Sequence, residues 1–138
     1  MIGILVVTHG SIGEALLTSA AQILGGAPVQ VATLSVWRQD DPDDLVLRAR
    51  ELLETLDAGD GVLVLTDIFG ATPGNVVSRL LEDGRVEGVS GASLPMLLRV
   101  LTSRNGSTGS KLSAAVQRAI SGGSEGVVHM NSDRCCDA

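Results

Sequence analysis

The chain has 138 residues and a mass of 14.2 kDa, a size typical of one domain built around a single hydrophobic core. Ten Lys and Arg residues against sixteen Asp and Glu residues give a formal net charge of −6 at pH 7. This balance excludes a broad basic surface of the kind that binds nucleic acid or anionic lipid. Aliphatic side chains must fill the core, because Trp37 and Phe69 are the only Trp and Phe and the chain has no Tyr.

Apolar runs alternate along the chain with segments of helical periodicity. The expected strands are 2–7, 29–36, 61–66 and 86–89, and the expected helical faces are 12–23, 45–56, 76–81, 94–101 and 112–120. This alternation predicts an α/β fold in which a mostly parallel sheet, of strand order 2-1-3-4, is covered by helices on both faces. The apolar segment Val127–Met130 could add a C-terminal edge strand. We expect one domain over residues 1–130 and a tail over 131–138.

The longest apolar run, Met1–Val7, is far too short to cross a bilayer, and no basic segment precedes it as in a secretion signal. We therefore expect a cytoplasmic protein. Cys135 and Cys136 are adjacent, which favours a reduced, exposed pair over a disulfide or a metal site. The chain has neither the spacing of a metal site nor a nucleotide-binding glycine motif, so we expect no cofactor.

Two polar residues follow neighbouring strands of the predicted sheet. His9 comes after the strand 2–7, and Asp67 comes after the strand 61–66. Ligands of open α/β sheets bind at this carboxyl edge. A carboxylate bonded to one imidazole nitrogen fixes the tautomer and leaves the other nitrogen as a nucleophile or base. Either residue alone could be a turn residue, and their expected pairing favours a functional site.

Two helices are expected to begin beside this pair. Ser11-Ile-Gly-Glu14 has the spacing of a capping box, and Pro73 suits the first position of the helix that follows Asp67. Free amides and the positive end of a helix dipole attract an oxyanion such as a phosphoryl group. The candidate groups that bind phosphate are Gly10, Ser11, Gly70, Ala71 and Thr72, and Thr72 could instead cap its helix.

Three segments resemble the mannose-type enzyme IIA domain of the bacterial phosphoenolpyruvate-dependent sugar phosphotransferase system. They are Thr8-His9-Gly10, Asp67–Asn75 and Gly91–Leu97. The resemblance implies a parallel sheet and a homodimer. It also implies a histidine that the carrier HPr phosphorylates, a IIB-type protein that accepts the group, and a membrane reached only through a permease complex.

On this resemblance, His9 is the phosphorylated residue, as tele-phosphohistidine, and Asp67 orients it. Thr72 then lies near the phosphoryl group. The family usually has Asn where this chain has Ser93. We expect Phe69 and Met96 to belong to an apolar rim on which each partner protein docks.

Two alternative functions stay open at this point. The first is the phosphotransfer subunit of a dihydroxyacetone kinase, which shares the fold and a histidine at this place. The stretch Phe69–Asn75 is more similar to the mannose type. The second is a signalling module whose phosphorylation state is recognised by another protein, so that the role is regulation and not sugar uptake.

Overall fold

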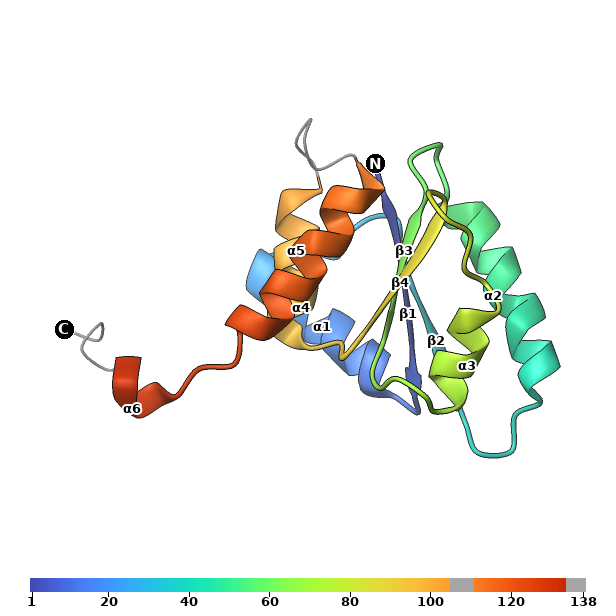
Figure 1. Cartoon of the computed structure of the whole chain (residues 1–138), viewed down its shortest axis with the longest axis horizontal. Coiled ribbons are helices and arrows are strands. Elements are labelled where there is room, and N and C mark those ends of the chain that lie inside the picture. Colours follow the sequence, from blue (N-terminus) through green and yellow to red (C-terminus); the bar gives the residue numbers. More distant parts are fainter. Residues whose placement is uncertain (105–110, 134–138) are drawn as a thin grey trace.

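A parallel four-stranded sheet is the middle layer of the computed structural model, which describes residues 1–104 and 111–133 (Figure 1). The strands are β1 (Gly3–His9), β2 (Val31–Val36), β3 (Val62–Thr66) and β4 (Val86–Ser90). They lie in the order β2-β1-β3-β4, and all three pairings are parallel. The predicted fold class and strand order are therefore confirmed.

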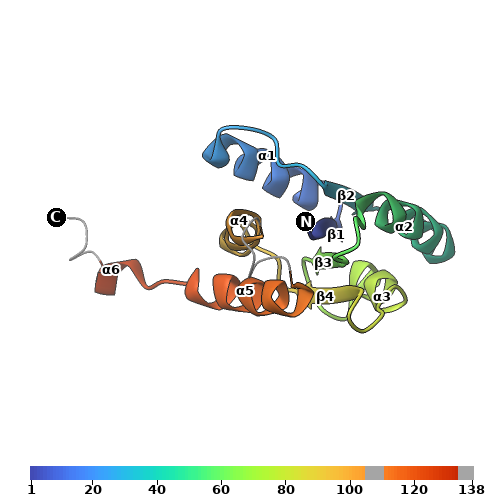
Figure 2. The same cartoon turned by 90° about the horizontal axis from the view of Figure 1, so that it is seen from above.

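Helices cover both faces of this sheet. Figure 2 shows α1 (Ile12–Leu24), α4 (Leu94–Ser103) and α5 (Leu112–Glu125) on one side, and α2 (Pro42–Leu56) and α3 (Thr72–Ser78) on the other. A short helix, α6 (Met130–Asp133), follows α5. None of the helices in the described ranges has the length and apolar character that crossing a bilayer would require.

The two central strands are apolar along their length because both of their faces are buried. In β1, Ile4 and Val6 pack under α1, α4 and α5. Leu5 and Val7 point the opposite way and pack under α2 and α3. A parallel strand with helices on both sides has no solvent face, so its sequence is a continuous apolar run. This is why β1 and β3 were the easiest strands to predict.

The register of the sheet brings the carboxyl ends of its strands together. His9 of β1 pairs with Val36 of β2, and Val7 pairs with Thr66 of β3. The loops that leave β1, β2 and β3 therefore begin side by side at one edge. Polar residues in these loops can meet there although they are far apart in the sequence.

Several element boundaries differ from the sequence-based expectation. β2 begins at Val31, because Gln30 adopts a left-handed conformation with φ +52° that interrupts the extended run. α2 begins at Pro42, before the expected start at Leu45, because Asp41 caps it by accepting the backbone N–H of Asp43 at 3.0 Å. The helix after Asp67 begins one residue earlier than expected, so Pro73 occupies its second position.

The prediction that the C-terminal segment adds an edge strand to the chain's own sheet is wrong. Residues 127–129 have no regular secondary structure, and α6 follows them. Gly126 packs against Pro95 at the start of α4, and from there the chain leaves the body of the molecule (Figure 1). Val127 and Met130 are exposed. An apolar segment becomes a strand only when a sheet edge lies beside it to pair with, and here the chain does not return to the sheet. Cys135 and Cys136 lie outside the described residues.

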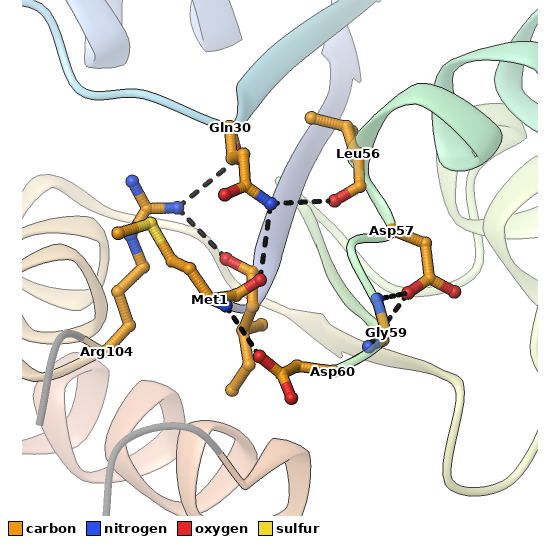
Figure 3. Close-up of polar contacts among 9 residues, drawn as sticks. Met1, Gln30, Leu56, Asp57, Gly59, Asp60 and Arg104 are labelled. Atoms are coloured by element: carbon orange, nitrogen blue, oxygen red, sulfur yellow. Dashed lines mark hydrogen bonds and ion pairs between the residues drawn. The ribbon is translucent and has the colours of Figure 1, made fainter. Parts of the chain in front are cut away.

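Arg104 closes the amino-terminal edge of the sheet, opposite the edge described above. Its buried guanidinium donates hydrogen bonds to the carbonyls of Ile2 at 3.1 Å and Gln30 at 3.3 Å, and to that of Val29. Figure 3 shows the contact between Arg104 and Gln30. The Gln30 side chain continues the network to the Leu56 carbonyl at 3.1 Å. Burial lowers the pKa of the Arg104 guanidinium, and the backbone carbonyls replace the water that it has lost.

Candidate functional site

His9 and Asp67 are in direct contact at the carboxyl edge, as the sequence predicted. One carboxylate oxygen of Asp67, Oδ2, lies 2.8 Å from His9 Nδ1 and accepts the His9 backbone N–H at 3.1 Å. The other oxygen accepts the backbone N–H of Ile68 at 3.0 Å. The Asp67 side chain is 12% exposed, whereas that of His9 is 48% exposed. The carboxylate is therefore fixed from several sides while the ring reaches solvent.

The charge of Asp67 determines which ring nitrogen of His9 is free to react. Burial works to raise the pKa of Asp67, but hydrogen bonds from the ring and backbone of His9, and the charge of the ring, hold that pKa below its ordinary value. An ionised carboxylate accepts hydrogen bonds and cannot donate them, so Nδ1 of His9 carries a hydrogen. In the neutral ring the lone pair then lies on Nε2. Nε2 makes no hydrogen bond within residues 1–104 and 111–133, so its lone pair is free of any partner there.

Gly10 turns the chain from β1 towards α1. Its φ of +49° lies in the left-handed region, which a glycine adopts without steric cost. Its N–H donates to the Val36 carbonyl at 2.9 Å, so the ladder between β1 and β2 extends one residue past His9. Because this N–H already has an acceptor, the contribution of Gly10 to the site lies in its backbone conformation.

The predicted capping box at the start of α1 is wrong. Ser11 is the N-cap residue but makes no side-chain cap bond, since its φ of −92° and ψ of 10° depart from the usual extended conformation of an N-cap. Buried Thr8 instead accepts the Gly13 N–H at 2.8 Å through its hydroxyl. Glu14, the other expected box residue, accepts from Ser35 at 3.5 Å. The cap therefore comes from the strand, at the residue before His9, and the Ser11 hydroxyl makes no cap bond.

The loop from Asp67 to α3 supplies the other predicted phosphate-binding residues. Gly70 has a φ of +89°, and Ala71 is the N-cap residue, without a side-chain cap bond. Thr72 is the first residue of the helix, so the alternative that Thr72 caps it is wrong. The backbone N–H groups of Gly70, Ala71 and Thr72 donate no hydrogen bond within the part of the chain that the structure describes. The loop therefore offers backbone donors of the kind that can bind an anion.

Exposed apolar side chains occur in the loops and helix start at this edge. Phe69 is 83% exposed, and Ile12, Trp37 and Ile68 are each about half exposed. The expectation that Met96 joins them is wrong, because its side chain is 3% exposed and packs against Gly123. A contiguous patch of exposed apolar side chains is typical of a surface that docks another protein.

Ser93 and His129 complete the sequence-based candidates. Ser93 caps α4 by accepting the Met96 N–H at 3.3 Å. Asn and Ser are comparably good caps, so Ser at this position preserves the function that an Asn could serve. His129 precedes α6, which lies away from the sheet (Figure 1), and contacts the Ser132 hydroxyl at 2.9 Å. His129 therefore does not join His9 at the carboxyl edge.

Comparison with known proteins gives one consistent set of relatives. A family model described as the PTS system fructose IIA component, where PTS stands for phosphotransferase system, matches residues 3–117. The PTS system mannose-specific EIIAB component of Escherichia coli (strain K12) is 32% identical over 127 residues, which are 91% of this chain and 38% of that protein. The PTS system fructose-specific EIIA component of Bacillus subtilis (strain 168) is 31% identical over 105 residues, 75% of this chain and 71% of that protein.

A solved structure shows the same arrangement of elements. The crystal structure of phosphotransferase system component EIIA from Streptococcus agalactiae superposes with a TM-score of 0.83 at 27% identity. The match covers 96% of this chain and 99% of that one. The chain spans 38% of the length of the Escherichia coli relative.

The cap on α1 gives a stability prediction. Thr8→Val keeps the volume of the side chain but leaves the Gly13 N–H without its acceptor, so we expect the free energy of unfolding to fall by about 1–2 kcal/mol. Ser11→Ala removes no cap bond and should change it by less than about 0.5 kcal/mol. Urea unfolding followed by far-UV circular dichroism measures both. A larger loss of unfolding free energy in Ser11→Ala than in Thr8→Val would support the capping box and contradict the cap supplied by Thr8.

Proposed function

Because the chain belongs to the family of phosphotransferase-system IIA components, we propose that it is a phosphocarrier in which Nε2 of His9 accepts a phosphoryl group and passes it on. The observation that carries this proposal is the 2.8 Å contact between Asp67 and Nδ1 of His9, which leaves Nε2 as the reactive atom on an exposed ring. The donor is phospho-HPr and the acceptor is a IIB-type protein, in sugar uptake or its regulation. The membrane takes part only through a permease complex.

The transfer exchanges one phosphorus–nitrogen bond for another. The lone pair of His9 Nε2 attacks the phosphorus of the phosphohistidine on the donor as the bond to the donor ring breaks in line. The donor imidazole leaves with the bonding electron pair. His9 keeps its Nδ1 hydrogen and becomes positively charged, and the Asp67 carboxylate stabilises that charge. Onward transfer is the same exchange with His9 as the leaving ring, and it uses no metal or cofactor.

Nearby donors support the phosphoryl oxygens in this proposal. The hydroxyls of Ser11 and Thr72 lie at the starts of the two helices that flank the pair. The backbone N–H groups of Gly70 and Ala71 are available in the loop between Asp67 and α3. Donors that are already in place stabilise the charge of the transferring group without reorganisation.

We also propose that two chains form a homodimer through the segment that leaves the body after Gly126. Val127 and Met130 are exposed on this segment, and Val128 is half exposed. An apolar arm that projects from the molecule (Figure 1) gains from burial against a second copy of the chain. In the dimer, the arm of one chain pairs with an edge strand of the sheet in the second chain.

The first prediction of this proposal concerns the site of phosphorylation. Incubation with phosphoenolpyruvate, enzyme I and HPr should label the wild type and His129→Ala equally and leave His9→Ala unlabelled. The label should be lost in acid, because a phosphorus–nitrogen bond to imidazole hydrolyses there. Mass mapping locates the group. A label on His129, or an undiminished label in His9→Ala, would show that the assignment is wrong.

A second prediction concerns the role of Asp67. Asp67→Ala removes the acceptor at Nδ1, so we expect phosphoryl transfer to slow by about 10²- to 10⁴-fold while the fold survives. Nitrogen NMR of the His9 ring should show the Nδ1–H form in the wild type and a mixture of tautomers in the variant. Asp60→Ala is the matched control, since Asp60 pairs with the Met1 amino group at the opposite edge of the sheet (Figure 3). Equal rates of phosphoryl transfer in the wild type, Asp67→Ala and Asp60→Ala would show that Asp67 is only a turn residue.

A third prediction concerns the homodimer. Light scattering at micromolar concentration should give twice the chain mass of 14.2 kDa for the full chain. Truncation after Gly126 removes the apolar arm, keeps α5, and should give the mass of one chain. Truncation after Asp133 keeps the arm and is the control. A single-chain mass for the full-length protein would contradict the dimer.

A further inference from the structure

Trp37, the single tryptophan of the chain, packs against the residue that follows His9. A β-carbon built on Gly10 would lie 3.2 Å from Cζ3 and 3.4 Å from Cη2 of the Trp37 indole. The six-membered part of the indole therefore lies over the side of Gly10 from which a β-carbon would project. The ring therefore covers the turn that carries the phosphoacceptor histidine of the proposed function.

The backbone of Trp37 is itself held in place. Its N–H donates to the carboxylate of Asp40 at 2.8 Å, and the Asp40 N–H donates back to the Trp37 carbonyl at 3.0 Å. One residue earlier, the Val36 carbonyl accepts the Gly10 N–H at 2.9 Å. The indole thus projects from a closed turn whose strand is already joined to Gly10.

The contact between the Trp37 indole and Gly10 matters because the backbone of a glycine has wide conformational freedom. Gly populates positive and negative φ about equally, so a glycine directly after His9 is a pivot about which the histidine backbone could turn. The indole fills the space beside the α-carbon and limits that movement. A β-carbon at position 10 would press on this ring at 3.2 Å, and the φ of +49° also favours glycine there.

The exposure of Trp37 distinguishes this contact from ordinary core packing. The side chain is 52% exposed, whereas the core of this protein consists of aliphatic side chains that are nearly or fully buried. A half-exposed tryptophan contributes little to the core, yet one side of its ring rests on the turn of the site. The contact is therefore better explained by what it does to the turn.

We propose that Trp37 is a positioning residue for His9, which restrains Gly10 and so keeps Nε2 aimed for in-line transfer. This inference rests on the proposed function. Transfer rates are sensitive to alignment, since a displacement of about 1 Å can cost on the order of 10²-fold. The restraint acts on one side of the turn only, so we expect about a tenfold loss of rate without the ring.

Two phosphoryl donors separate positioning from partner docking. Phospho-HPr must dock on the protein, whereas phosphoramidate is a small donor that releases ammonia and needs no docking surface. Trp37→Ala should lower the maximal rate of His9 phosphorylation with both donors by about tenfold, with little change in the KM for phospho-HPr. Trp37→Phe keeps a six-membered ring and should recover most of the rate. Leu47→Ala removes an exposed apolar side chain from α2 and should leave both rates unchanged.

Two kinetic outcomes would overturn the proposal. A loss seen only with phospho-HPr, as a raised KM, would make Trp37 a docking contact. Equal maximal rates in the wild type and in Trp37→Ala with both donors would leave the ring without any role in transfer.

NMR of the unphosphorylated protein tests the restraint without any transfer. Trp37→Ala should remove the ring-current shift of the Gly10 α-hydrogens and increase the backbone mobility of His9 and Gly10, and Trp37→Phe should preserve both. Unchanged signals in Trp37→Ala would overturn the proposal. Failure of the proposed function would look different, because the wild type itself would then take no phosphoryl group at His9 from either donor.

Discussion

The paired hydrogen bonds from His9 to Asp67 are the interaction on which the whole site depends. One comes from the ring at 2.8 Å and the other from the backbone at 3.1 Å, so a single carboxylate oxygen fixes both the tautomer and the chain position of the histidine. The adjacent, parallel arrangement of β1 and β3 makes this possible, because it brings residues 58 positions apart to the same edge. The apolar layers under the helices serve the site by holding these two strands in register.

The sequence predicted the sheet and the His9–Asp67 pair well because both follow from burial. Central parallel strands are apolar on both faces, and the residue after such a strand must emerge at an edge. The cap on α1 was missed because the motif Ser11–Glu14 is local, whereas the actual acceptor is fixed by the sheet. The alternation of side chains along β1 could have indicated this acceptor, because it places Thr8 on the same face as Ile4 and Val6, where α1 packs.

Surface features were harder to predict because they depend on how loops meet. Met96 looked available for a rim, but its position beside Leu97 and Val100 on the buried face of α4 places it in the core. The contact of Trp37 with Gly10 depends on the register of β1 and β2, which no local pattern specifies. The segment 127–130 has a strand-like composition, and composition alone does not supply a neighbouring strand.

Arg104 has a consequence for how the chain folds as it is made. Its guanidinium binds the Ile2 carbonyl across 102 positions of sequence, and it lies after all four strands. Until Arg104 has left the ribosome, the carbonyls at the amino edge of β1 lack their donor. Contacts so distant in sequence form late and slow the folding of a domain. The turn that carries His9 is thus synthesised well before the sheet beneath it can be completed.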